Sequence, residues 1–96
     1  MKISHSSLAA AKKQALLVEY PGLIRHFDEL ENVIKSNPDI GTKELMPNKA
    51  GGNTPVHILS AQTEIFSGAL SYSKELTVVY IYSDDMTNGR IIQYLF

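Results

Sequence analysis

The last third of the chain constrains the fold more than any other part of the sequence. Residues 76–82 and 91–96 are two apolar runs rich in β-branched and aromatic side chains, separated by the polar segment 83–89. Runs of this kind, bounded by turn residues, predict two antiparallel strands. The run centred on Val79 is apolar at consecutive positions. A strand of that composition is typical of the middle of a sheet, with both faces covered.

Two helical segments are predicted before these strands. Residues 8–19 are rich in strong helix formers, and Ser6 or Ser7 can cap that helix through its hydroxyl. Pro21 interrupts the pattern and suits the first turn of a second helix, predicted over residues 21–36. That segment has the clearest helical periodicity in the chain, with apolar residues at Leu23, Phe27, Leu30 and Ile34. Helices joined this tightly are expected to form an antiparallel hairpin.

The remaining segments complete an α+β fold. Residues 2–6 could form a short edge strand, residues 37–53 are predicted to be a loop, and residues 55–62 a strand. Between residues 63 and 73, either that strand continues or a hairpin turn forms at Ser67 and Gly68. We therefore expect residues 1–96 to form a single domain. In it, an N-terminal helical hairpin packs on a small antiparallel sheet of three to four strands.

Charge and composition limit the classes of function. The formal net charge is −1 and nine basic residues are scattered among ten acidic ones, which argues mildly against a nucleic-acid partner. The chain has no cysteine and no apolar run of about 18 residues that could span a bilayer. We expect a cytoplasmic protein with no membrane role.

The order of these segments resembles the RelE/ParE superfamily of toxins from bacterial type II toxin–antitoxin modules. Three stretches carry the resemblance, and they occur in the same order as in the family. In the first, residues 30–41, a predicted helix ends at Asn37 and Pro38, shortly before a glycine. The second, residues 46–52, precedes a predicted strand, and the third is residues 75–80. The last stretch is similar to a family strand usually written Leu-Arg-Val-Ile-Tyr. Thr77 stands at the position of its arginine.

The resemblance implies a growth inhibitor that a cognate antitoxin neutralises. RelE-like and HigB-like members cut messenger RNA on the ribosome, as metal-independent endoribonucleases, whereas ParE-like members inhibit DNA gyrase without hydrolytic chemistry. Ribosome-dependent mRNA cleavage is the first hypothesis for this chain. The alternative is a non-enzymatic protein, either a gyrase inhibitor or a degenerate toxin that only binds its antitoxin. Thr77 in place of arginine and the near-neutral charge favour the alternative.

RNA cleavage needs a base, a cation at the phosphorus and an acid for the leaving oxygen. His57 is the best candidate for base or acid, because imidazole exchanges protons near neutral pH. We also assign candidate catalytic roles to Arg90, Lys49 and Tyr82. Each has a simpler structural interpretation: a strand histidine, a solvated arginine, a surface lysine and a packing tyrosine.

No cofactor or metal is expected. The three histidines, His5, His26 and His57, are too far apart in sequence for the short spacing of zinc ligands. The Ala50-Gly51-Gly52 segment is not followed by the lysine that a phosphate-binding loop requires.

Overall fold

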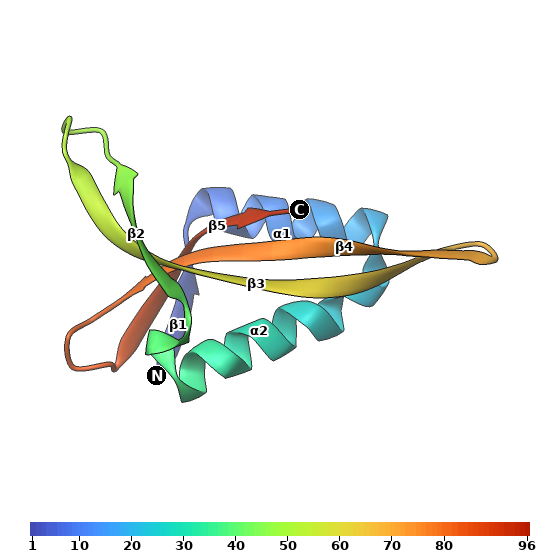
Figure 1. The fold of residues 1–96 in the computed structure, drawn as a ribbon, viewed down its shortest axis with the longest axis horizontal. Helices are drawn as coiled ribbons and strands as arrows, with labels where there is room; N and C mark the ends of the chain where they lie inside the picture. The colour runs from blue at the N-terminus through green and yellow to red at the C-terminus, as the bar shows by residue number, and fades with distance from the viewer.

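The computed structural model describes the backbone of residues 1–96 and every side chain except that of Ser67. The fold is α+β, as predicted (Figure 1). In chain order its elements are β1 (Lys2–His5), α1 (Ser7–Glu19), the 3₁₀ turn η1 (Pro21–Leu23), α2 (Ile24–Ser36), the 3₁₀ turn η2 (Pro38–Ile40), β2 (Thr42–Pro47), β3 (Asn53–Ser67), β4 (Leu70–Tyr82) and β5 (Asn88–Leu95).

The five strands form one sheet in the order β1-β5-β4-β3-β2. Strand β4 therefore lies in the middle, and both of its neighbours, β3 and β5, run antiparallel to it. This confirms the central position predicted for the run around Val79. Strand β1 lies at the edge of the sheet, next to β5, and runs parallel to β5.

The prediction of a three- to four-stranded antiparallel sheet beneath an N-terminal helical hairpin was wrong in two respects. The sheet has five strands and is mixed, and the helices follow β1, so they lie between the first and second strands. The additional strand is β2, and the mixed character of the sheet comes from β1. A strand at the start of the chain can pair in parallel with the last strand because the intervening helices and strands supply the long connection that parallel pairing requires.

Most of the predicted loop at residues 37–53 is regular structure. It contains η2 and β2, and β2 pairs antiparallel with β3 from Thr42 opposite Ile58 to Pro47 opposite Asn53. Strand β2 is exposed on both faces along most of its length, and even Leu45 is 67% exposed. Its sequence therefore lacks the alternation of apolar and polar residues from which a strand could be predicted. Its conformation is set by the backbone groups of β3. In residues 63–73 both predicted alternatives occur: β3 continues to Ser67, and a turn follows at Gly68.

The helices begin where the sequence indicates. The Ser6 side chain accepts a hydrogen bond from the Ala9 N–H at 3.1 Å and caps α1. Pro21 opens η1, and α2 follows directly with Phe27, Leu30 and Ile34 buried. These side chains meet those of alternate strand residues. The resulting core cluster comprises Ala9, Leu16, Leu23, Phe27, Leu30, Ile34, Leu76, Val78, Tyr80, Ile91 and Tyr94.

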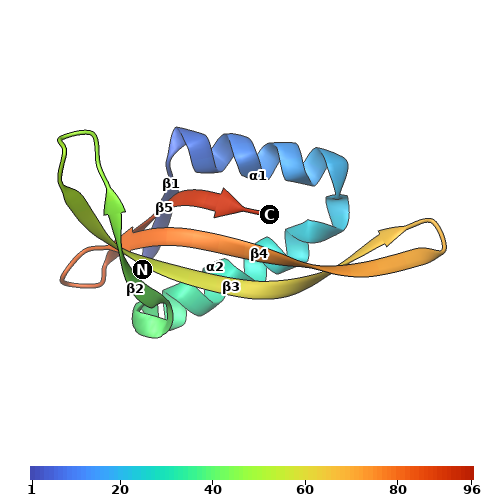
Figure 2. The same ribbon diagram turned by 45° about the horizontal axis from the view of Figure 1, so that its top comes forward.

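The helices thus cover one face of the sheet, which we call the helix face. Leu76, Val78 and Tyr80 of β4 point toward it, so by alternation Thr77 and Val79 point to the opposite, open face. Val79 is nevertheless only 1% exposed, since Ile58 and Gln93 lie directly beside it in the register. Figure 2 shows that the β3–β4 hairpin extends beyond both helices at one end of the molecule, and the β2–β3 hairpin projects at the other.

Candidate functional site

His57 lies on the helix face, with an aromatic side chain on one neighbouring strand and a cation on the other. In the register, Tyr80 of β4 and Lys43 of β2 are its direct opposites. The imidazole centroid is 5.5 Å from the Tyr80 ring and 4.9 Å from the Tyr82 ring. Residues directly opposite in a sheet share a face, so Lys43, His57 and Tyr80 project to the same side. Together with Tyr82 and Asp39 we call these residues the His57 cluster.

The loop after α2 closes over this cluster. The Tyr80 hydroxyl donates to the Pro38 carbonyl at 2.6 Å and accepts from the Gly41 N–H at 3.1 Å. The Tyr82 hydroxyl donates to the Asp39 carboxylate. The segment that directly follows α2 is therefore bonded to the central strand β4.

Gly41 is required by this close approach. A Cβ atom at this position would lie 2.8 Å from the Tyr80 hydroxyl, 3.0 Å from the Ile58 carbonyl oxygen and 3.1 Å from the His57 Cβ. Contacts this short would force the loop, the Tyr80 hydroxyl or the β3 backbone to shift, so a larger residue would disturb the packing of the loop on the sheet.

A depression of about 220 Å³ opens beside the cluster. It is lined by Lys43, Pro55, His57, Ile81, Tyr82 and Asp84. His57 is 9% exposed, with its ring packed against the two tyrosines, and it lines this depression. A ligand in the depression would meet the imidazole at its accessible edge.

The two phenols of the cluster are held in their protonated form. The hydrogen bond to Asp39, supported by desolvation, raises the pKa of Tyr82 to about 12. Burial raises the pKa of Tyr80, and the nearby Asp39 charge acts in the same direction, although the Gly41 N–H opposes them. Both phenols are therefore hydrogen-bond donors rather than bases at neutral pH.

The structure brings together two of the four predicted catalytic residues, His57 and Tyr82. Arg90 pairs with Ile81 and so projects to the open face, while His57 and Tyr80 project to the helix face. Lys49 lies in the exposed turn between β2 and β3, where the Asn48 side chain accepts from the N–H groups of Ala50 and Gly52. Neither cation lines the depression beside His57.

Arg90 lines a separate depression of about 300 Å³. Its walls are formed by Ser4, Ile81, Tyr82, Ser83, Asn88, Gly89 and Arg90. Ile81 and Tyr82 contribute to both depressions, so the two hollows lie near the same end of β4. Thr77 is on the open face, where its hydroxyl is 2.8 Å from that of Ser60 and donates to Glu75 at 3.4 Å.

Sequence reasoning missed Lys43 and Asp39 as members of the site. Lys43 gave no signal because it falls in a segment predicted to be a loop, and only the β2–β3 register places it beside His57. Asp39 did carry a weak signal. It lies within the Asn37–Gly41 stretch that forms part of the family resemblance, where a short turn could bring a carboxylate onto the sheet.

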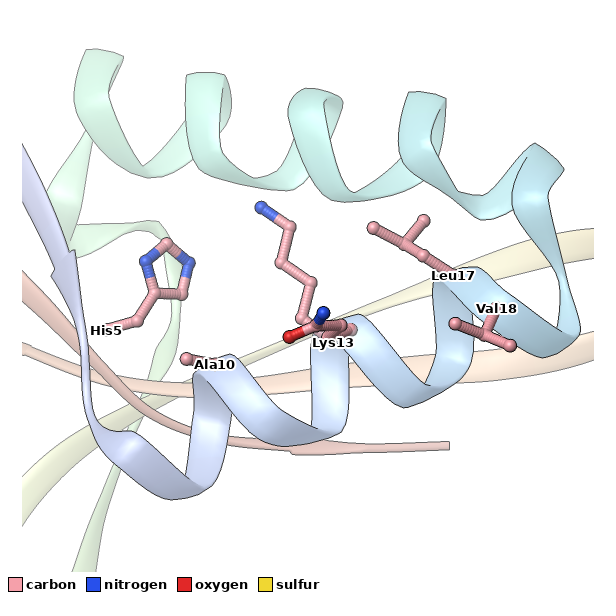
Figure 3. A pocket seen from close by; sticks show the side chains of 6 residues that line it. His5, Ala10, Lys13, Leu17 and Val18 are labelled. Carbon is pink, nitrogen blue, oxygen red and sulfur yellow. The ribbon is translucent and has the colours of Figure 1, made fainter.

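A second polar cluster lies between the two helices, centred on Glu31 of α2. Its Oε1 atom is 2.7 Å from His5 Nε2, 3.3 Å from Lys13 Nζ and 3.4 Å from the Tyr94 hydroxyl. Figure 3 shows His5 and Lys13 directed into the space between α1 and α2. One carboxylate oxygen thereby connects α2 with β1, α1 and β5.

A depression of about 390 Å³ adjoins this second cluster. His5, Ala10, Lys13, Gln14, Leu17 and Val18 line it, so its wall is mostly the aliphatic surface of α1. It holds few polar groups able to orient a small molecule, and it is better suited to apolar side chains from a partner.

Among the residues described, no three or more histidine, cysteine or acidic side chains gather in a way that could hold a metal ion. Within the same part of the chain, neither helix has the length and apolar character needed to cross a membrane. Comparison with protein-family models, with curated proteins and with solved structures finds no match to this chain.

Proposed function

We propose that this protein is the toxin of a bacterial type II toxin–antitoxin module of the RelE/ParE kind, and that it inhibits growth by cutting messenger RNA on the ribosome. The observation that carries the proposal is the placement of His57, between Lys43 and Tyr82 at the edge of an accessible depression. The central, antiparallel position of β4 and the bonding of the α2 end to β4 support the resemblance seen in the sequence.

The residues of the cluster can divide the chemistry of RNA cleavage among them. His57 accepts the proton of the ribose 2′-hydroxyl, and the 2′-oxygen then forms a bond to phosphorus. The bond from phosphorus to the 5′-oxygen breaks, and the imidazolium returns the proton to that oxygen. The products are a 2′,3′-cyclic phosphate and a free 5′-hydroxyl. Lys43 offsets the negative charge that develops on the phosphorane oxygens. Because the proposed target is the ribosome, we propose that the protein acts in the cytoplasm.

Inducible expression in bacteria tests this proposal directly. Growth should stop on induction, and primer extension on host transcripts should reveal new RNA ends. Growth arrest without new ends would eliminate the nuclease. A matched strain that expresses His57→Gln separates cleavage by this site from a general response to an overexpressed protein, because the fold should persist while the ends disappear.

A second candidate function is non-enzymatic. Arg90 and Lys49 are not part of the His57 cluster, which leaves Lys43 as the cation beside the imidazole in the described structure. Thr77 bonds to Ser60 and Glu75 and offers no charge at the position of the family's arginine. These features favour a gyrase inhibitor or a degenerate toxin that only binds its antitoxin. Supercoiling assays with purified protein discriminate between these two, because a degenerate toxin would leave gyrase unaffected.

The antitoxin is proposed to bind along α1 with an amphipathic helix of its own. Helix α1 exposes Leu8 by 62% and Val18 by 79%, and the aliphatic depression lies along its surface. Lys12 adds positive charge to this helix, whose first acidic residue is Glu19, whereas Lys13 is paired with Glu31. An acidic amphipathic helix would complement both properties. The decisive observation is whether a small adjacent reading frame encodes a protein that co-purifies with this one and neutralises it.

A further inference from the structure

A small hollow lies where the connection between α1 and α2 meets the β3–β4 hairpin. Figures 1 and 2 show this connection beside the hairpin, at the point where the two strands extend past the helices. The hollow has a volume of about 150 Å³, and we call it the η1 pocket. Its lining includes residues from the end of α1, from η1 and from β3: Glu19, Tyr20, Leu23, Glu64, Ile65 and Phe66.

The size of the η1 pocket suits a single side chain. Sites for small-molecule ligands commonly measure about 300–1,000 Å³, so a hollow of about 150 Å³ is too small for most of them. Leu23 is 2% exposed and Ile65 4%, so the pocket has a well-packed apolar lining. The aliphatic stem of a long side chain can cover such a surface while its polar head remains at the rim.

Two carboxylates accompany this apolar lining. Glu19 and Glu64 belong to different elements, and neither forms a salt bridge within the part of the chain that the structure describes. Hydrogen bonding to Tyr72, and secondarily to Glu19, raises the pKa of Tyr20 to about 12, so the Glu19 carboxylate lies close to the Tyr20 hydroxyl. The described lining contains no lysine or arginine. The pocket is therefore negatively charged, and a cationic group complements it.

Aromatic residues in the lining distinguish between the two basic side chains. Tyr20 and Phe66 both line the pocket, and Lys74 of the neighbouring strand lies over the Phe96 ring instead. A guanidinium group is planar and weakly hydrated, stacks on aromatic rings, and has a fork of N–H donors that can bind carboxylates. An ammonium group is a compact and strongly hydrated point charge. Arginine therefore fits this pocket better than lysine does.

Exposed apolar side chains near the pocket favour a protein as the source of the arginine. Leu70 is 74% exposed, Phe66 70% and Tyr72 46%, and all three lie at the same end of the β3–β4 hairpin. Neighbouring apolar residues on a surface commonly mark an interaction site. A protein segment with apolar residues beside its arginine would cover these side chains, whereas a free cation would leave them exposed.

We propose that the η1 pocket binds an arginine side chain of a partner protein. The guanidinium group binds between Glu19 and Glu64, and the aliphatic stem covers Leu23 and Ile65. Apolar residues beside the arginine in the partner cover Phe66 and the end of the hairpin. This inference does not depend on the proposed function.

Nuclear magnetic resonance titrations of the isotope-labelled protein test the chemistry of the pocket. The probes are the N-acetyl amides of arginine, lysine and citrulline, and citrulline has nearly the shape of arginine without its charge. The arginine probe should shift amide signals in residues 19–23 and 64–66 and saturate with a dissociation constant in the millimolar range. The lysine and citrulline probes should bind at least about threefold more weakly. Equal affinity for the three probes, or no saturable shift in these residues, would overturn the inference.

Matched variants test the carboxylate and the aromatic wall. Glu64→Gln should weaken binding of the arginine probe at least about threefold, because it removes a charged hydrogen-bond acceptor. Glu29→Gln removes the same charge from an exposed side chain outside the pocket and should bind normally. Phe66→Ala should weaken binding about two- to fivefold, and Leu70→Ala, at an equally exposed position outside the lining, should not. Circular dichroism verifies the fold of each variant. Equal affinities within either pair would exclude this pocket.

Two peptides test whether a protein segment is the occupant. Both are acetylated tripeptide amides with arginine in the middle, flanked by leucine in one and by serine in the other. The leucine-flanked peptide should bind at least about threefold more tightly, because its side chains cover exposed apolar surface beside the pocket. Equal affinity of the two peptides would contradict the docking of an apolar partner segment.

Discussion

The Tyr80 hydroxyl donates a 2.6 Å hydrogen bond to the Pro38 carbonyl, which joins the central strand β4 to the loop that follows α2. Tyr80 itself is fully buried, and the same hydroxyl accepts from the Gly41 N–H. One side chain thus satisfies the Pro38 carbonyl of η2 and the N–H of Gly41, which directly follows that turn. This relationship positions Asp39 over Tyr82 and so shapes the His57 cluster.

Replacing Tyr80 by phenylalanine should lower the free energy of unfolding by about 1–3 kcal/mol. The substitution keeps the packed ring but leaves the Pro38 carbonyl and the Gly41 N–H without their partner. Urea denaturation followed by circular dichroism measures the change. Tyr94→Phe is a suitable comparison, because the Tyr94 hydroxyl bonds to side chains that retain other partners. An equal or smaller loss in Tyr80→Phe would contradict the role given to this bond.

Gly41→Ala should destabilise the protein by about 1–3 kcal/mol, because its Cβ would lie 3.0 Å from the Ile58 carbonyl oxygen and 2.8 Å from the Tyr80 hydroxyl. Gly52→Ala provides the matched control, since the nearest atoms to a Cβ there are 3.7 Å away on an exposed side chain. Both can be compared by thermal unfolding. Unchanged stability in Gly41→Ala would mean that the loop has room to move.

His57→Gln should abolish RNA cleavage and leave binding to the partner protein intact, because an amide cannot exchange the proton that the reaction needs. Lys43→Gln should reduce cleavage by about 10²–10³-fold, the usual effect of removing one group that stabilises the transition-state charge. Lys49→Gln, in the distant β2–β3 turn, should cleave normally. Primer extension and co-purification provide the two measurements. Retained cleavage in His57→Gln would remove this residue from the mechanism.

The protein should lose stability between pH 10 and 12 through Tyr82. The hydrogen bond to Asp39 raises the Tyr82 pKa from its ordinary 10.0 to about 12 in the folded state. In that interval the unfolded chain has released a proton that the folded chain still holds, so raising the pH favours unfolding. The contribution is fully present below pH 10. Asp39→Asn should move the Tyr82 titration toward 10, as measured by tyrosinate absorbance. An unchanged titration curve would mean that Asp39 does not hold this phenol.

Glu31→Ala should cost about 1–2 kcal/mol of stability, since one carboxylate oxygen contacts His5, Lys13 and Tyr94 from three different elements. Glu29→Ala on the same helix should change stability by less than about 0.5 kcal/mol, because its side chain is 64% exposed and lies 4.0 Å from His26. Chemical denaturation of the two variants under identical conditions makes the comparison. Similar losses of stability in the two variants would show that the Glu31 contacts do not stabilise the folded state.

Local patterns in the sequence were sufficient for the helices and for the central strand. Leu23, Phe27, Leu30 and Ile34 recur at helical spacing and are all buried, and the continuous apolar run around Val79 did mark the middle of the sheet. The signals failed where exposure removes periodicity. Strand β2 is largely exposed, and β4 is exposed over residues 70–75, so neither segment shows the alternation that a half-covered strand would carry.

The candidate site was only partly accessible to the same reasoning. His57 and Tyr82 were chosen for their chemistry, and β3 and β4 bring their rings within 4.9 Å. Arg90 was chosen in the same way, but its pairing with Ile81 sends it to the open face. Side chains alternate between the two faces along a strand, so the face on which a residue lies can be assigned only when the strand register is known. A shift of one residue moves every side chain to the other face.

The sequence by itself determined the α+β class, the amphipathic second helix and the apolar core strand, because each depends on the spacing of apolar residues within one segment. Tertiary structure alone decided the parallel pairing of β1, the conversion of the 42–47 segment into a strand and the grouping of Lys43 and Asp39 with His57. Each of these joins residues through contacts between segments, and such contacts leave no pattern in either segment taken alone.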